Sequence, residues 1–305
     1  MEQFPTVEKL AEADLDSVLA MWSGLGYYSR ARNLHKAAKQ VVTLGSFPDT
    51  LVEIRKLSGV GEYIAGAIAS MAFDLDVGAV DGNLHRVLSR IFCDGGDRKR
   101  MWTVIEPLLP KGRCGDFNQA LMDLGSGICK KTPVCSSCPI QKHCRSFKED
   151  KTDQFPVKVK KKAPKKEFYV ALLIRHTDNA ENLWMGQRAP EKLYGGMVEP
   201  CLLVDTPDEP ADILTWITQY TNLPTEEVQW FDKGCFVHVL THKKMNVRVF
   251  ECILDNVNKD WFTDTTIEPY VEMRWLTPAE RKSVGLSTLA QKIIEQSKNG
   301  QLSLF

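Results

Sequence analysis

The sequence predicts a multidomain protein, with an all-α first half and an α+β second half. Residues 1–150 carry apolar side chains at helical spacing, with N-cap residues and glycine stops. The stretch 158–166 holds six lysines and one proline, which suits a linker. After it the pattern becomes β-rich. We expect two domains, a basic linker and a tail, at 1–150, 167–298, 151–166 and 299–305.

The composition narrows the class of protein. The formal net charge is +0, so binding to nucleic acid would depend on local basic patches. Hydrophobic residues make up 43% of the chain, enough for ordinary packed cores. We find no signal peptide and no apolar run long enough to cross a membrane. We therefore expect an intracellular, soluble monomer with no membrane partner.

The first half reads as a series of short helices and one longer helix. N-caps are expected at Thr6, Asp14 and Asp49. Gly24 is expected to end the second helix. The segment Ser29–Leu44 is amphipathic and should be the longer helix, and a further helix is expected at Asp116–Leu124.

A glycine turn, Gly59-Val60-Gly61, lies between two apolar helical runs. Glycine permits a tight turn with positive φ, and the helix that follows presents unpaired N–H groups that suit a phosphate. Further on, Asp81 precedes the helical run Leu84–Leu88. This stretch leaves two interpretations of Asp81 open: an N-cap, or a carboxylate placed beside a reacting sugar.

In the second half we expect four strands and two helices. The strands are expected at Phe168–Arg175, Leu183–Gln187, Gly234–Leu240 and Val247–Leu254. The helices are expected at Asp212–Tyr220 and Thr288–Gln296. This mixture predicts an α+β domain.

Four of the nine cysteines are clustered, with five, two and five residues between them: Cys129, Cys135, Cys138 and Cys144. In an intracellular chain such a loop (129–144) suggests a metal or iron–sulfur centre before disulfides. A single Cys-x2-Cys pair favours a [4Fe–4S] cluster, with zinc and unliganded thiols as alternatives. Nearby Lys142 and Arg145 either solvate the loop or bind a DNA backbone.

Several of these motifs resemble a known family. Leu57–Ala69 and Val80–Asn83 resemble the helix-hairpin-helix region of DNA glycosylases, and the cysteine loop resembles the iron–sulfur branch that contains endonuclease III and MutY. Two segments of the first half specifically resemble MutY-type adenine DNA glycosylases: Trp22–His35 and Phe117–Gly125. Two segments of the second half resemble the Nudix-like domain with which that family recognises 8-oxoguanine: Leu193–Gly196 and His238–His242.

The resemblance implies a monofunctional N-glycosyl hydrolase that removes adenine paired with 8-oxoguanine or guanine in duplex DNA, after flipping the base out. It implies that Asp81 stabilises the developing oxocarbenium ion and that Asn83 helps place the water. Tyr63 falls where bifunctional relatives carry a Schiff-base lysine, so strand cleavage is not expected.

By the same resemblance, Leu25 and Tyr27 wedge into the duplex, with core packing as the alternative. Gly59 and Gly61 belong to the phosphate-binding hairpin, and Thr241 and His242 read the lesion unless they form a hairpin tip without a ligand.

The chain also departs from the family. Its general-acid Glu lies upstream of the point where this chain begins, so a second function is open: a lesion-binding form that recognises mispairs and recruits partners with impaired catalysis. A third function, Nudix hydrolysis, needs a glutamate-rich Arg-Glu-x-x-Glu-Glu helix that does not follow Gly195-Gly196.

The last residues, Gln301–Phe305, resemble peptides that dock on sliding clamps, and the alternative is that they fold back on the second domain. The basic linker favours a nuclear location. The mitochondrion, or the cytoplasm of a prokaryote, is the alternative.

Overall fold

The computed structural model describes residues 3–157, 163–206, 230–254, 269–298 and 302–303. The chain divides into two compact units, one made of Met1–His35 with Lys162–Phe305 and the other of Lys36–Lys161. The division falls within helix α3 (Ser29–Leu44), whereas the predicted domain boundary lay at the basic linker. The reason is that part of the first 35 residues packs on the second half.

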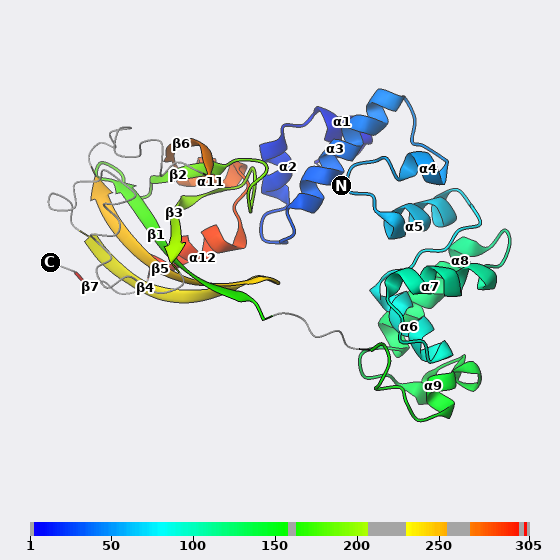
Figure 1. The fold of residues 1–305 in the computed structure, drawn as a ribbon. Coiled ribbons are helices and arrows are strands. Elements are labelled where there is room, and N and C mark those ends of the chain that lie inside the picture. Colours follow the sequence, from blue (N-terminus) through cyan, green and yellow to red (C-terminus); the bar gives the residue numbers. More distant parts are fainter. Residues whose placement is uncertain (1–2, 158–162, 207–229, 255–268, 299–301, 304–305) are drawn as a thin grey trace. The chain divides into compact units, whose positions relative to one another are not determined.

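The Lys36–Lys161 unit is helical (Figure 1). Its α-helices after α3 are α4 (Leu51–Ile54), α5 (Glu62–Ala72), α6 (Gly82–Phe92), α7 (Arg98–Ile105), α8 (Cys114–Asp123) and α9 (Arg145–Lys148). Short 3-10 turns lie at η1 (Glu106–Leu108), η3 (Cys135–Ser137) and η4 (Gln141–His143), and a π-helical turn at η2 (Leu124–Ile128). The core combines apolar faces of α6, α7 and α8, including Leu84, Leu88 and Met101.

Side-chain caps begin the helices much as predicted. Thr6 and Asp14 cap α1 (Val7–Glu12) and α2 (Leu15–Met21) by accepting backbone N–H groups. Three details differ from the prediction. The cap of α4 is Thr50 rather than Asp49, and α2 ends at Met21, before Gly24. Helix α8 begins two residues earlier than expected, at Cys114.

In the other unit, α2 and the start of α3 pack against the second half. Leu19, Tyr28 and Met197 are buried in one cluster. The Tyr28 hydroxyl accepts the Thr288 amide at 2.9 Å, and Ser23 Oγ accepts the Leu286 amide at 3.0 Å. These contacts explain why residues 1–35 cluster with the sheet.

The second half contains a mixed seven-stranded sheet in the order β6-β2-β3-β1-β5-β4-β7. Its strands are β1 (Lys165–His176), β2 (Leu183–Arg188), β3 (Val198–Thr206), β4 (Trp230–Val239), β5 (Lys243–Leu254), β6 (Tyr270–Leu276) and β7 (Leu302–Ser303). Central β1 pairs parallel with β5 and antiparallel with β3. The α+β prediction is confirmed, and β3 and β6 are strands that the sequence did not predict.

Both faces of the sheet are covered by apolar side chains. On one face Leu172, Trp230 and Phe250 form a core, and on the other Leu173 and Val249 pack with Leu289 of helix α12 (Thr288–Gln296). Helix α11 (Pro278–Ser283) carries a capping box at Thr277. The predicted helix Asp212–Tyr220 lies outside the described residues. Among the helices that the structure describes, none has the length and apolar character needed to cross a membrane.

Candidate functional site

The hairpin between α4 and α5 has the geometry of a helix-hairpin-helix turn. Gly59 adopts a φ of 77°, which favours glycine, whereas Gly61 is extended and serves as the N-cap of α5. Only Gly59 therefore needs the positive φ that the sequence suggested for the turn. Gln40 Oε1 accepts the Ser58 amide at 2.7 Å and so braces the hairpin from α3.

Asp81 is the N-cap of α6, and its Oδ1 accepts the Leu84 amide at 2.7 Å. Its other carboxylate oxygen is not engaged by this bond. Burial, followed by the charge of Asp81, raises the pKa of the Tyr63 phenol. The Tyr63 hydroxyl lies 3.9 Å from Met122 Sδ of α8. Both predicted catalytic residues thus belong to the helical unit, Tyr63 on α5 and Asp81 at the start of α6.

Asn83 follows Asp81 by two residues and is held by Arg86, a residue that the sequence analysis did not single out. Arg86 Nη2 donates to Asn83 Oδ1 at 2.9 Å and to Gly125 O at 2.7 Å. Its Nε donates to Cys129 O at 2.7 Å. One guanidinium therefore ties the Asn83 amide to the backbone that leads into the cysteine loop. Nothing next to Arg86 in the sequence reveals these distant acceptors.

The four clustered cysteines are half-buried and lie on a loop built from short turns. Burial and then the charges of Cys129, Cys144 and Cys138 raise the pKa of Cys135, so the four thiols lie close enough to interact. Buried Arg90 donates to Cys129 Sγ at 3.3 Å and to Lys130 O at 2.6 Å. In the part of the chain that the structure describes, no three His, Cys, Asp or Glu side chains are grouped tightly enough for a single metal ion.

Four cysteine thiols on one short loop are side chains of the kind that hold a metal ion or an iron–sulfur cluster. An iron–sulfur cluster holds its four thiolates around a cube of iron and sulfide, so they stand farther apart than ligands of one zinc ion. Lys142 and Arg145 are exposed at this loop, and Arg145 pairs with Glu149 at 2.6 Å.

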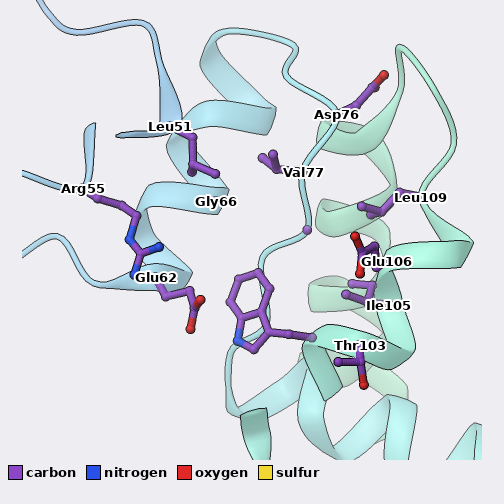
Figure 2. Close-up of a pocket in the computed structure, with 12 residues that line it drawn as sticks. Leu51, Arg55, Glu62, Gly66, Asp76, Val77, Thr103, Ile105, Glu106 and Leu109 are labelled. Carbon is purple, nitrogen blue, oxygen red and sulfur yellow. The ribbon is translucent and has the colours of Figure 1, made fainter. Parts of the chain in front are cut away.

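A cavity of about 270 Å³ lies between α4, α5 and α7 (Figure 2). Its lining includes Arg55, Glu62, Gly66, Val77 and Trp102. Asp81, Asn83 and Tyr63 do not line it. This hollow is therefore separate from the predicted catalytic group of the same unit.

In the other unit the predicted wedge residues stand on an exposed, strained loop. The side chains of Leu25 and Tyr27 are 69% and 74% exposed, so core packing does not explain them. Gly24, Gly26 and Tyr27 all have positive φ, which is unusual for tyrosine. The Trp22 indole donates to Gly26 O at 2.9 Å and holds the loop in place.

This loop forms one wall of a cavity of about 500 Å³. Thr241 and His242, the predicted lesion-reading residues, line the same cavity. Tyr194 lines it too, and its hydroxyl lies 3.0 Å from Nε2 of buried His238. Sequence analysis missed one further lining residue, Arg32, whose guanidinium donates to Gly195 O at 2.6 Å.

Comparisons with known proteins place these sites in context. A model of the HhH-GPD superfamily of base excision DNA repair proteins matches residues 1–106, and a NUDIX domain model matches residues 170–296. The adenine DNA glycosylase of Buchnera aphidicola (subsp. Baizongia pistaciae) is 32% identical over 98% of this chain and 82% of its own length. This chain belongs to the adenine DNA glycosylase family.

Other adenine DNA glycosylases are similar over most of the chain. The human enzyme is 30% identical and the mouse enzyme 29%, each over 96% of this chain. The chain spans only 62% and 66% of the length of these two relatives. A solved endonuclease III–DNA complex is 28% identical over 49% of this chain and 72% of its own, with a TM-score of 0.44, and we draw no argument from it.

Membership of the adenine DNA glycosylase family identifies the two folds. The helical part belongs to the HhH-GPD superfamily, and the mixed-sheet part is a Nudix-like domain. The family is one of DNA glycosylases, enzymes of base excision repair. After Gly195-Gly196 the chain continues as strand β3. The glutamate-rich motif that Nudix hydrolysis needs does not occur in the sequence at this place.

Proposed function

We propose that this chain removes adenine mispaired with 8-oxoguanine from duplex DNA. The observation that carries the proposal is the shared cavity, in which the wedge loop with Tyr27 faces the hairpin that carries Thr241 and His242. An aromatic side chain there stacks on unpaired bases, while hydroxyl and imidazole groups read a base edge. A cavity of about 500 Å³ has the size of an ordinary small-ligand site.

Excision breaks the bond between the sugar C1′ and adenine N9. Electron density leaves with the base, and the positive charge that develops on the sugar is stabilised by the Asp81 carboxylate. Water then adds to C1′, placed by the Asn83 amide, whose oxygen Arg86 already holds. The attacking water gives up a proton as it bonds to C1′, and the leaving adenine takes up a proton from solvent water. Tyr63 is a poor donor for this step because its pKa is raised.

The proposed reaction is monofunctional. Strand cleavage by the imine route needs a primary amine at the sugar C1′. At the position where bifunctional relatives carry the lysine, this chain has the phenol of Tyr63, which forms no imine. We therefore expect an abasic site as product, with an intact strand until alkali is added.

We assign the four clustered cysteines to a [4Fe–4S] cluster. Cys129, Cys135, Cys138 and Cys144 would hold it, and Arg90 would donate to the Cys129 sulfur. When bound, the cluster supplies a fixed fold for the loop. The residues of the loop then present Lys142 and Arg145 to a phosphate backbone.

The first prediction separates the enzyme from the alternative lesion-binding function. We expect tighter binding to duplex with adenine opposite 8-oxoguanine than to undamaged duplex, together with single-turnover release of adenine. Tight binding without release would favour the lesion-binding alternative. Equal binding to the two duplexes would contradict both, because neither function works without recognition of the lesion.

A second prediction concerns Thr241. The isosteric change Thr241→Val removes the hydroxyl and keeps the shape, so discrimination between 8-oxoguanine and guanine should fall by roughly three- to tenfold, the worth of one hydrogen bond. Affinity for undamaged duplex should hardly change, since phosphate contacts position and base contacts specify. Competition binding measures both. Thr241→Ser retains the hydroxyl and is the matched control; a similar loss in both variants would argue against this role.

The tail adds a proposal about partners. Gln301, Leu304 and Phe305 lie outside the described residues, while Leu302–Ser303 pairs as strand β7 with Phe231 and Asp232 of β4. We propose that the tail docks on a sliding clamp, for which this short pairing would have to open. A nuclear location stays a proposal that rests on the basic linker.

A further inference from the structure

A buried amide lies one layer beneath the predicted catalytic group. Asn118 of α8 has no exposed surface, yet three of the four hydrogen-bonding positions of its side chain are filled, both donors among them. Its Nδ2 donates to Val77 O at 2.9 Å and to Ser70 Oγ at 2.9 Å. Its Oδ1 accepts the Ala79 amide at 3.1 Å. Rotating the amide by half a turn would set donor against donor, so the orientation is fixed.

The partners of Asn118 come from three separate segments. Ser70 lies on α5, Asn118 on α8, and Val77 and Ala79 on the connection that ends at Asp81. Glycines bring these segments to backbone contact. A Cβ on Gly66 would lie 2.1 Å from Gly78 O, and one on Gly115 would lie 2.5 Å from Ser70 O. Figure 2 shows the segment with Val77 running past Gly66 of α5.

Helical spacing relates this layer to the site. Tyr63 and Ser70 are seven residues apart on α5, and Asn118 and Met122 are four apart on α8. Both spacings place side chains on the same face of a helix. Tyr63 and Met122 contact each other, while Asn118 bonds to Ser70 and also to the connection at Val77 and Ala79, four and two residues before Asp81.

We propose that Asn118 is a positioning residue for Asp81: by fixing the connection Val77–Val80 against α5 and α8, it sets where the carboxylate meets the sugar. The inference rests on the proposed function of Asp81. A displacement of about 1 Å at a reacting group costs on the order of a hundredfold in rate, so one buried amide suffices to matter. Asn118 touches no substrate in this account.

The test uses the amide of Leu84 as a reporter, because that N–H donates to Asp81 Oδ1. In Asn118→Ala we expect hydrogen exchange at Ala79 and Leu84 to quicken by about tenfold, while Leu88 inside α6 keeps its protection. Single-turnover excision should fall about a hundredfold, with duplex affinity within about threefold of the parent. Gln119→Ala, at the exposed next position of α8, is the control and should change neither quantity.

A second variant supplies a pH signature and covers the chance that Asn118→Ala fails to fold. In Asn118→Asp the ionised carboxylate repels Val77 O, whereas the protonated form donates to Val77 O and accepts the Ala79 amide. Relative to the parent at each pH, Leu84 protection and excision should therefore recover as the pH falls. If the ratio of Asn118→Asp to parent, for Leu84 protection and for the excision rate, does not change with pH, the proposal is overturned.

Two further outcomes decide the matter. Faster exchange throughout α5, α6 and α8 in Asn118→Asp at high pH would show a structural role only, and would overturn the inference. If excision proves not to depend on Asp81, the proposed function fails. The Leu84 amide would then still decide whether Asn118 fixes the position of Asp81.

Discussion

Asp81→Asn should lower the rate of adenine excision by roughly a hundred- to a thousandfold while leaving the fold intact. Asparagine caps a helix about as well as aspartate, so the bond from the Leu84 amide to the side-chain oxygen survives. What is lost is the negative charge beside the sugar, and with it the stabilisation of the transition state. Single-turnover release of adenine measures the effect, with thermal unfolding as the check on stability.

Asp97→Asn is a matched control for this change. Asp97 caps α7 in the same manner, through the Arg100 amide at 2.9 Å, and takes no part in the Asp81 group. The parent rate should survive in this variant. An independent readout is the Tyr63 phenol, whose pKa the charge of Asp81 helps to raise. That pKa should fall in Asp81→Asn and stay in Asp97→Asn; a phenol unmoved by both would show that the two groups do not interact.

Cys138→Ser should abolish the iron–sulfur cluster. The purified parent should be brown and carry about four irons per chain. A serine hydroxyl is a poor replacement for a thiolate at iron. Loss of a group that binds only the folded loop lowers the apparent melting temperature and weakens duplex binding, because Lys142 and Arg145 are no longer held together. Iron analysis, visible absorbance and salt-dependent DNA binding measure these effects.

Cys235→Ser serves as the control for the cysteine change. Cys235 is exposed on β4, outside the helical unit that carries the loop, so its loss should leave iron content and colour unchanged. Stoichiometric zinc in the parent chain, with no iron, would contradict the assignment. So would full iron content in Cys138→Ser.

Local rules predicted much of the fold. Thr6 and Asp14 cap helices as their types suggest, and runs rich in strand-forming residues located β1, β2, β4 and β5. Strand β3 was missed because Glu199 and Pro200 interrupt its apolar pattern. In the fold Glu199 is fully buried, pairs with Arg188 at 2.5 Å and accepts from Tyr270. Glu199 can therefore be buried in a strand because residues distant in the sequence pair with its carboxylate.

The candidate site shows the same limit. Asp81 and Tyr63 carry their own signal, because residue type and motif point to them. The roles of Arg86 and Asn118 depend on partners about forty residues away, which the local sequence does not reveal. Arg86 bonds to Cys129, and Asn118 bonds to Val77 and Ser70. Sequence analysis left Asp81 as either a cap or a catalytic carboxylate. In the structure Asp81 caps α6 through Oδ1, and this bond does not use its second carboxylate oxygen.

The packing of α2 against the second half limits how this protein can be recombined. A Cβ on Gly285 would lie 2.6 Å from that of Leu19, and Met197 fills the space beside them. The HhH-GPD match spans residues 1–106, so a domain exchange made at the family boundaries would separate Leu19 from the Nudix-like half. A Nudix-like half transferred to a foreign helical partner would arrive with a hollow at Gly285. Joining the two domains therefore requires a matched side chain at this contact as well as a linker.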